Sequence, residues 1–260
     1  FHFKDIDFGQ TEIRTTRLPK GLKLEHLTFS NPDFSAMATG NWISDDRGKT
    51  SQLDMKIKSP ALAPLLDRFR YKAANIEGGE AEIRIDASWP GTPADFSLNR
   101  MVGTFELHAV DGRFLDIDPG GGRLFGLLSL QTLPRRLTFD FSDLFRKGFA
   151  FDRIDGIFQI EAGNAYTNSL TMEGPAARIN VSGRTGLIEK DYDQRAIVTP
   201  ALSSSIPIAA ALFGPIGAGA GAVYYLGGKV FKSIPKKIDK FLTREYSIRG
   251  SWENPIIEKI

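Results

Sequence analysis

The chain has 260 residues, with 33 Lys or Arg against 31 Asp or Glu, so its formal net charge at pH 7 is +2. This balance does not favour nucleic-acid binding, which needs clustered basic residues. The absence of cysteine excludes disulfides, thiolate metal sites and a cysteine nucleophile. Because the first residue is Phe1 and not methionine, we expect the chain to be part of a longer protein.

Alternation of apolar and polar residues dominates the chain and predicts β-strands with one apolar face. In one such run, Tyr166 and Leu170 are expected on the same face. Turn residues separate the runs at short spacing, which indicates antiparallel meanders and not βαβ units. The clearest runs cover residues 53–58, 82–89, 104–109, 137–142, 166–173, 178–182 and 246–251.

The tryptophans occur in one repeated context, in which each follows a strand-like run and precedes a turn. Such self-similarity favours a repeated β-unit over chance. The three segments are Gly40-Asn41-Trp42, Ala87-Ser88-Trp89 and Gly250-Ser251-Trp252.

Two helices are predicted within the strand-rich part. Residues 60–75 have an apolar face, with Ser59 as the expected cap and Pro60 at the first position. Residues 123–133 are apolar nearly all round, so this helix is expected to be buried or inserted in a membrane.

A further helical segment is expected at 203–245. No charged residue lies between Arg195 and Lys229, and a basic amphipathic stretch follows at 229–244. The apolar part is long enough to cross a bilayer, but its prolines and glycines argue against one clean span. The segment is therefore expected either to contact a membrane or to cap one end of the sheet.

The strands together pose a packing problem. Roughly a dozen one-sided strands create an apolar face larger than soluble proteins usually expose. The face can close as a sandwich or barrel, or remain an open curved sheet that holds an apolar ligand. Periodicity does not choose among these solutions.

From Asp111-Gly112-Arg113-Phe114 onward the sequence resembles a known family. The matching segments include Asp118-Pro119-Gly120-Gly121-Gly122, Leu133-Pro134-Arg135-Arg136-Leu137, Lys147-Gly148-Phe149-Ala150-Phe151-Asp152 and Tyr246-Ser247-Ile248-Arg249-Gly250-Ser251-Trp252. They resemble the C-terminal region of YhdP-type AsmA-like envelope proteins of Gram-negative bacteria. The resemblance covers the chain from about residue 80 to its end, and the first 80 residues are expected to continue the same β-repeat.

The resemblance implies a bridge-like lipid transport protein that is anchored in the inner membrane and extends through the periplasm. It implies a mainly β fold: a curved antiparallel sheet forming an open or partly closed groove, with a few helices. Phospholipid and membrane, with the outer membrane at the C-terminal end, are the expected partners. No catalytic residue, cofactor or nucleic acid is implied. We expect a β-groove segment at 1–110 and the AsmA-like C-terminal region at 111–260, with a final strand at 246–252.

Two sets of contact residues follow from this expectation. Apolar residues on the dry side of the strands are expected to line the lipid groove: Ile83, Ile85, Phe105, Leu107, Leu137, Phe139, Phe141, Phe158, Ile160, Leu170, Met172, Ile179 and Val181. Aromatic and basic residues of the late segment are expected to contact the membrane: Phe213, Tyr224, Tyr225, Phe231, Lys229, Lys232, Lys236, Lys237 and Lys240.

Two alternatives remain open at this point. One is a structural or interaction module that supports outer-membrane assembly and barrier integrity without binding lipid. The other is a hydrolase of envelope polymers, which would have to use residues such as Asp116, Asp118 or His108. Neither a Gly-x-Ser-x-Gly nor a His-Glu-x-x-His motif occurs in the sequence, so we expect no enzyme and no metal site.

Overall fold

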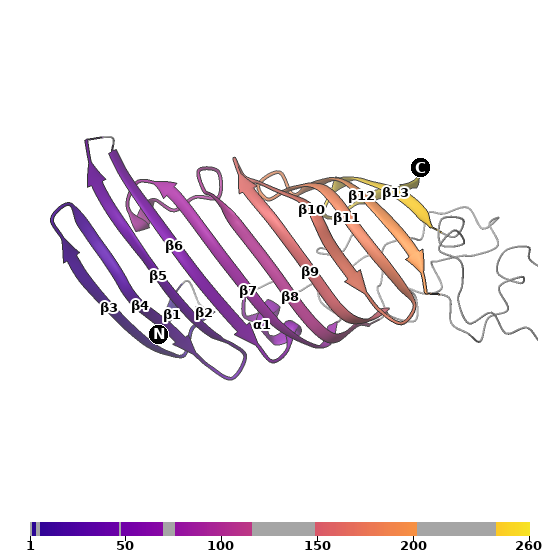
Figure 1. Ribbon diagram of the computed structural model, residues 1–260, viewed down its shortest axis with the longest axis horizontal. Coiled ribbons are helices and arrows are strands. Elements are labelled where there is room, and N and C mark those ends of the chain that lie inside the picture. The colour runs from indigo at the N-terminus through magenta and orange to yellow at the C-terminus, as the bar shows by residue number, and fades with distance from the viewer. Residues whose placement is uncertain (1, 4–5, 47, 70–75, 116–148, 202–242) are drawn as a thin grey trace, which may run out of the picture.

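The computed structural model describes residues 2–3, 6–46, 48–69, 76–115, 149–201 and 243–260. Its main feature is one open 12-stranded sheet, in which the strands follow chain order from β3 to β14 (Figure 1). Every neighbouring pair is antiparallel, so the predicted mainly β, antiparallel fold is confirmed. In this meander each strand pairs with the next strand along the chain, as the predicted antiparallel arrangement indicated.

The strands of this sheet are β3 (Gln10–Leu18), β4 (Gly21–Ser30), β5 (Ser35–Asp45), β6 (Gly48–Ser59), β7 (Ile76–Pro90), β8 (Val102–Phe114), β9 (Phe149–Glu161), β10 (Asn164–Glu173), β11 (Ala177–Gly186), β12 (Asp191–Pro200), β13 (Arg244–Ser251) and β14 (Pro255–Lys259). A separate two-stranded sheet joins β1 (His2–Phe3) to β2 (Ile6–Asp7). The helical elements are α1 (Leu62–Arg68) and the 3₁₀ turn η1 (Pro93–Asp95). β13 lies where the last alternating run was predicted, whereas β14 had no prediction.

The sheet has one apolar and one polar side, because residues that pair across strands point to the same side. The dry face is the side that carries Met55, Ile85, Phe105 and Phe158, which pair in that order across β6 to β9. The wet face is the side that carries Lys56, Arg84, Glu106 and Ile157, which pair in the same way.

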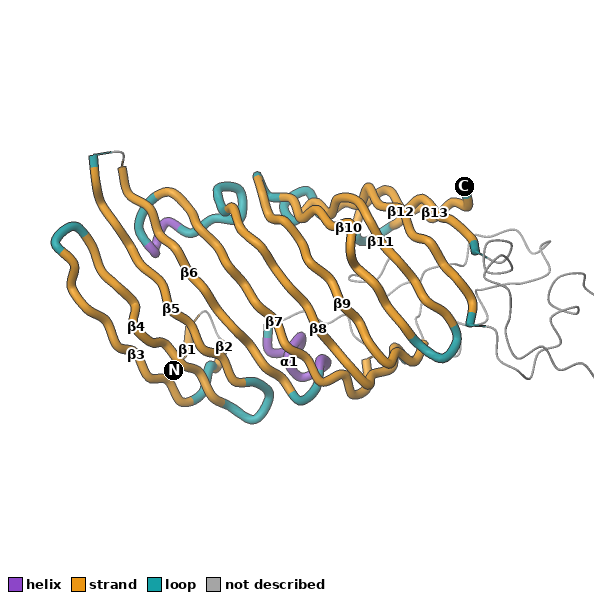
Figure 2. Tube along the Cα trace, in the orientation of Figure 1, coloured by secondary structure: helices purple, strands orange, loops and turns teal. Residues whose placement is uncertain are grey.

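The sheet coils along its length, and its strands slant across its long axis (Figure 2). Close backbone approach at glycines accompanies this coiling. A Cβ atom at Gly103 would lie 2.1 Å from the carbonyl oxygen of Asp86, and one at Gly40 would lie 2.3 Å from that of Gln52. Neighbouring strands therefore come too close at these points for any side chain.

Helix α1 is shorter than the predicted helix at 60–75, and its cap differs. The helix begins after Ala61, which has no side-chain cap, so the expected capping role of Ser59 is wrong. The Ser59 hydroxyl instead lies 2.7 Å from the backbone oxygens of Asp33 and Ala61, where it fastens the start of the helix to the β4–β5 turn. Residues 70–75 lie outside the described part of the chain.

A β-bulge in β10 corrects the predicted alternation. The pairing with β11 shifts between Thr167 and Leu170, which puts Leu170 on the dry face and Tyr166 on the wet face. Tyr166 is accordingly exposed, whereas Leu170 is buried. The two residues do not share a face, as unbroken alternation had predicted.

The predicted helix at 123–133 and most of the segment at 203–245 lie outside the described residues, since 116–148 and 202–242 are not described. The described strand ends that flank these residues, in β8, β9, β12 and β13, lie on the same edge of the sheet as α1, which joins β6 to β7. The division into 1–110 and 111–260 stays a prediction.

Candidate functional site

The centre of the dry face is made of apolar side chains that are only half buried. Phe105 faces Phe158 with ring centroids 5.8 Å apart at an interplanar angle of 63°. The neighbouring cross-strand row continues from Ile57 through Ile83 to Leu107. The half-buried members of the predicted groove set are Ile83, Ile85, Phe105, Leu107 and Phe158. The middle of the open sheet therefore presents apolar surface that is not fully packed.

The C-terminal part of the dry face is closed by its own packing. Leu170 pairs with Val181 and Met172 with Ile179, and these side chains pack in one core cluster with Tyr246, Ile248 and others. Val181 retains only 1% of its exposure. The fully buried members of the predicted set are Ile160, Leu170, Met172, Ile179 and Val181, while Leu137, Phe139 and Phe141 lie outside the described residues.

Helix α1 and residues 6–9, which we call the N-terminal arm, cover the dry face along one edge. Leu65 of α1 is buried in a cluster with Phe34, Ala36 and Ile57. Phe8 of the arm packs on the same cluster, with its ring centroid 4.8 Å from that of Phe29. These contacts cover the dry face along the edge that carries α1.

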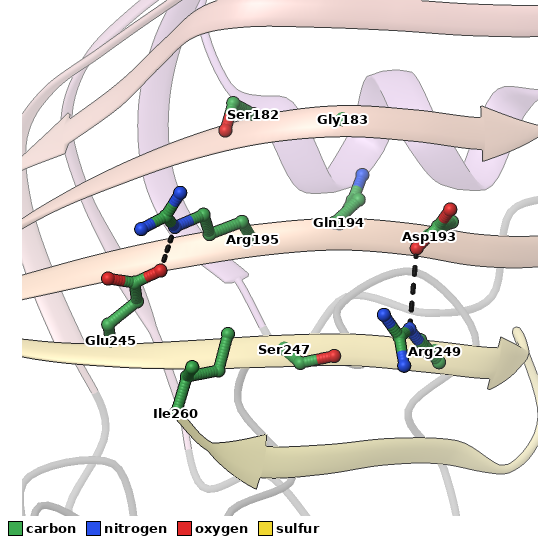
Figure 3. Close-up of a pocket in the computed structure, with 9 residues that line it drawn as sticks. All are labelled: Ser182, Gly183, Asp193, Gln194, Arg195, Glu245, Ser247, Arg249 and Ile260. Atoms are coloured by element: carbon green, nitrogen blue, oxygen red, sulfur yellow. Dashed lines mark ion pairs between the residues drawn. The ribbon is translucent and has the colours of Figure 1, made fainter.

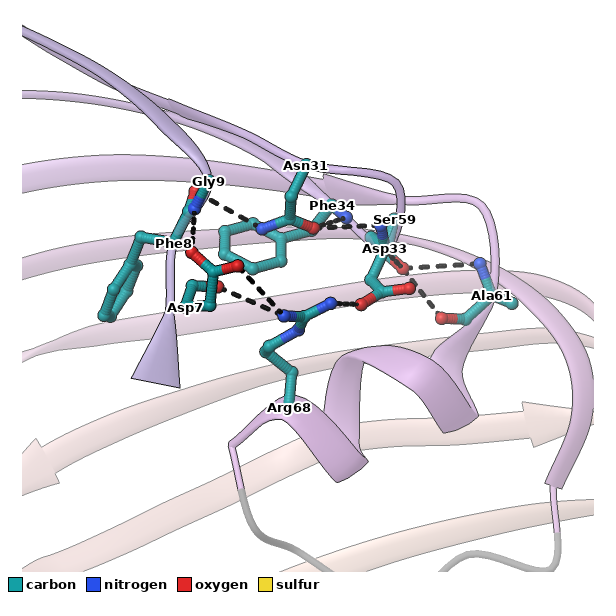
Figure 4. A network of polar contacts seen from close by, with 9 residues as sticks. All are labelled: Asp7, Phe8, Gly9, Asn31, Asp33, Phe34, Ser59, Ala61 and Arg68. Atoms are coloured by element: carbon teal, nitrogen blue, oxygen red, sulfur yellow. Dashed lines mark hydrogen bonds and ion pairs between the residues drawn. The ribbon is translucent and has the colours of Figure 1, made fainter. Parts of the chain in front are cut away.

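A polar network holds the arm and α1 together (Figure 4). The Arg68 guanidinium forms an ion pair with Asp33 in the β4–β5 turn, and it lies 3.9 Å from an Asp7 carboxylate oxygen. The Asn31 side chain accepts hydrogen bonds from the backbone N–H groups of Asp33 and Phe34 and donates one to the backbone oxygen of Phe8. The network joins residues that are distant in sequence and form no motif, so it could not be predicted from the sequence.

The opposite edge is bounded by the β7–β8 connection, which contains η1. Met101 is buried there against Trp89, Ile160 and Ala165. The Trp89 and Phe96 rings meet edge to face with centroids 5.2 Å apart. Between these two edges, no described residue forms a second layer over the centre of the dry face.

The wet face carries cross-strand ion pairs. His108 Nδ1 lies 2.6 Å from Asp155 Oδ1, and Arg153 bridges Asp155 and Glu173 at 3.2 and 3.3 Å. Exposed pairs of this kind contribute little to stability. They keep this side solvated, and His108 belongs to this surface network.

Charge partners also shift ionisation on the wet face. The hydrogen bond from Lys56 is the main reason that the pKa of Glu82 lies below its ordinary value. At one end of the sheet, hydrogen bonds from Arg184 lower the pKa of Asp191. Each partner stabilises the charged carboxylate, which fits a face that is built to remain in water.

A shallow pocket of about 370 Å³ crosses β11 to β13 on the wet face (Figure 3). Two ion pairs span it, one between Arg195 and Glu245 and one between Arg249 and Asp193. Its charged groups are neutralised in pairs, and it does not continue the dry face.

Met55 extends the central row of the dry face but was absent from the predicted set. Its alternation with Asp54 and Lys56 was a signal that could have included it. The expected membrane-contact residues, from Phe213 to Lys240, lie outside the described residues.

Within the described ranges, no three His, Asp or Glu side chains gather in a group that could hold a metal ion. No helix in that same part of the chain is long and apolar enough to cross a bilayer.

The comparisons with known proteins agree on one protein family. The chain is 28% identical over 228 residues to a protein of Escherichia coli (strain K12) named intermembrane phospholipid transporter YhdP. The aligned part covers 86% of this chain and 17% of that relative, so the chain spans about a sixth of the relative's length. No solved structure matches the chain. The family described as YhdP protein matches residues 1–257, and the chain therefore belongs to the YhdP family.

Proposed function

We propose that the dry face carries the acyl chains of phospholipids, as one part of a bridge that moves lipid between the inner and outer membranes. The observation that carries the proposal is the central row of Met55, Ile85, Phe105 and Phe158. This row is apolar, half buried and placed in the middle of an open sheet. The name of the relative, an intermembrane phospholipid transporter, supports the same assignment.

The energetics of such a surface suit transport. Burial of acyl chains contributes about 0.8 kcal/mol per CH₂ group, so a two-chain lipid binds without a dedicated headgroup pocket. The neighbouring strands β6 to β9, which carry the half-buried residues, provide similar contacts. A lipid can then shift from one strand to the next without leaving a deep energy minimum.

The wider setting is part of the same proposal. The chain would lie in the periplasm within a longer protein anchored in the inner membrane, with its C-terminal side towards the outer membrane. The aromatic and basic residues from Phe213 to Lys240 are proposed to contact that membrane. The proposal assigns the chain no chemical step, no cofactor and no nucleic-acid partner.

A pair of matched substitutions tests the proposal. Ile85→Asp places a charge in the central row, and Ile157→Asp places the same charge on the wet face, where Ile157 is 47% exposed. We expect Ile85→Asp to abolish co-purification of phospholipid in native mass spectrometry and Ile157→Asp to preserve it. Thermal unfolding of both variants verifies folding. Equal lipid content in the two folded variants would contradict the proposal.

The complete burial of Ile179 and Val181 favours a second role for the C-terminal part of the sheet. There the dry face packs on its own cluster, as expected for a structural module that supports envelope assembly without holding lipid. A photoreactive lipid should then label peptides around Phe105 and not those around Ile179. Labelling of both regions would extend the lipid path into β11 and remove the support for this second role.

A further inference from the structure

Two tryptophans, Trp42 in β5 and Trp89 in β7, lie at equivalent positions in the sheet, and Trp252 directly follows the end of β13. Each follows a small residue by two positions, and the register places these small residues in a single row that crosses the dry face from β5 to β13. The row is Gly40, Leu53, Ala87, Gly103, Ile160, Ala165, Thr185, Tyr192 and Gly250. Trp42, Trp89 and Trp252 therefore lie on the same edge of the dry face, which we call the tryptophan rim.

The indole N–H groups of this rim differ in one respect. Trp89 donates to the backbone oxygen of Thr92 at 3.0 Å, and Trp252 donates to that of Asp191 at 3.2 Å. The Trp42 N–H is shielded from solvent and has no acceptor among the described residues. In the register, Trp42 and Trp89 flank Ser51, whose hydroxyl donates to the backbone oxygen of Gly91.

The edge that carries α1 and the N-terminal arm is covered, and its buried cluster is apolar. The described aromatic residues of the cluster beneath α1 are phenylalanines, with Phe34 packed between Phe8 and Phe69 at centroid distances of 6.4 and 5.8 Å. The ion pairs of Arg68 tie the arm and α1 over this edge (Figure 4). The positive charge of Arg68 at this edge is compensated, because the guanidinium forms an ion pair with Asp33 and lies 3.9 Å from an Asp7 carboxylate oxygen.

The two edges differ in the part of a phospholipid that their side chains favour. An indole ring has an apolar body and one N–H donor, so tryptophan is favoured where apolar surface meets polar surroundings. A buried donor without an acceptor is unfavourable, and an ester or phosphate oxygen is a suitable acceptor. A phenylalanine ring has no such donor, so it favours contact with the apolar ends of the lipid acyl chains.

We propose that a bound phospholipid lies across the dry face with its glycerol and headgroup at the tryptophan rim and its acyl chains directed towards α1. In this arrangement the Trp42 N–H donates to an ester or phosphate oxygen of the lipid after a small displacement of the side chains that shield it. This inference rests on the proposed function and adds the orientation of the lipid to it.

Two photoreactive lipids test the orientation in the full chain. One is a phosphatidylethanolamine with a diazirine on the headgroup, and the other carries the diazirine at the end of one acyl chain. After irradiation, peptide mapping locates the labels. We expect the headgroup probe to label peptides that contain Trp42 and Trp89, and the chain-end probe to label peptides from α1 and the start of β7.

The outcomes separate the inference from the function on which it rests. The reverse pattern, or equal labelling of both edges by both probes, would overturn the orientation while lipid binding stands. No label on any dry-face peptide from either probe would contradict the proposed function itself. These outcomes do not depend on a variant that has to fold.

A substitution tests the role of the indole donor. Trp42→Phe keeps an aromatic ring and removes the N–H, and we expect lipid affinity to fall about fivefold, the effect of one lost hydrogen bond. Met37→Gln, on the exposed wet face of the same strand, should leave affinity unchanged. Unchanged affinity in a folded Trp42→Phe variant would refute the role of this donor.

Discussion

The carboxylate of Asp191 is held by a bidentate contact at the start of β12. Arg184 reaches its two oxygens at 2.9 and 2.6 Å, and the same guanidinium donates to the Asn164 side chain at 2.9 Å. These bonds stabilise the charged carboxylate, so the pKa of Asp191 lies below its ordinary value of 3.8. The contact ties β10, β11 and β12 together near the tryptophan rim.

This pairing predicts a pH-dependent contribution to stability. Because the pKa is lowered in the folded state, the contribution is complete above the ordinary pKa and is lost as pH falls through the folded value. We expect Asp191→Asn to lower the free energy of unfolding by about 0.5–1 kcal/mol at pH 7, since the pair is partly exposed. Urea unfolding at pH 7 and pH 3 measures the difference, and an equal loss at both values would be inconsistent with this account.

Gly103 makes a second prediction at the scale of single residues. A Cβ atom there would lie 2.1 Å from the carbonyl oxygen of Asp86, so alanine would force β7 and β8 apart. We expect Gly103→Ala to destabilise the chain by on the order of 2 kcal/mol, while Thr104→Ala at the next position changes stability by less than about 0.5 kcal/mol. Chemical denaturation measures both. A neutral Gly103→Ala would show that the sheet absorbs the added atom.

Among the elements, α1 is a short helix that packs on two parts of the dry face. Its length is below that of a helix that is stable alone, so its order depends on packing. Leu62 packs with the C-terminal core cluster and Leu65 with the N-terminal one. The helix therefore joins two parts of the sheet that have separate cores.

We expect Leu65→Ala to weaken the packing of α1 on the sheet. The buried side chain leaves a cavity, and the loss in stability is expected to be about 2–4 kcal/mol. Hydrogen exchange should accelerate in α1 and in the arm around Phe8, which share its cluster. Asp67→Ala, on the exposed side of the helix, is the control and should leave exchange unchanged. Faster exchange confined to α1 would mean that the arm holds its place without the helix.

Sequence patterns predicted the elements better than their details. Alternation identified β6 and β7 because one face of each is apolar and the other charged, and a meander follows from short turns. The bulge at Thr167 could not be predicted, because inserting one residue into a ladder leaves no mark on composition. The position of α1 depended on the Ser59 hydroxyl bonding to the β4–β5 turn, a contact that is distant in sequence.

The same limit applies to the candidate site. The apolar identity of Ile83 and Phe105 was readable from alternation, but their partial exposure depends on what packs above them. The difference between half-buried Phe158 and buried Val181 arises from tertiary packing alone. The unpaired donor of Trp42 also appears only when its neighbours are in place.

At the scale of the whole molecule, the open sheet explains why apolar residues at the centre of the dry face remain partly exposed. In a barrel or sandwich a second layer would bury the central row. Here the sheet ends at β3 and β14, and the described residues cover only its edges and its C-terminal part. A half-covered apolar face of this kind is suited to an elongated apolar guest.

Site-specific crosslinking tests this account most directly. A benzophenone amino acid at Phe105, on the dry face, is compared with one at Ile157, on the wet face of the adjoining strand, in cells that express the protein. The account predicts a phospholipid adduct at position 105 and none at 157, detected by mass spectrometry. The absence of an adduct at 105 in a folded, crosslinking-competent protein would contradict it.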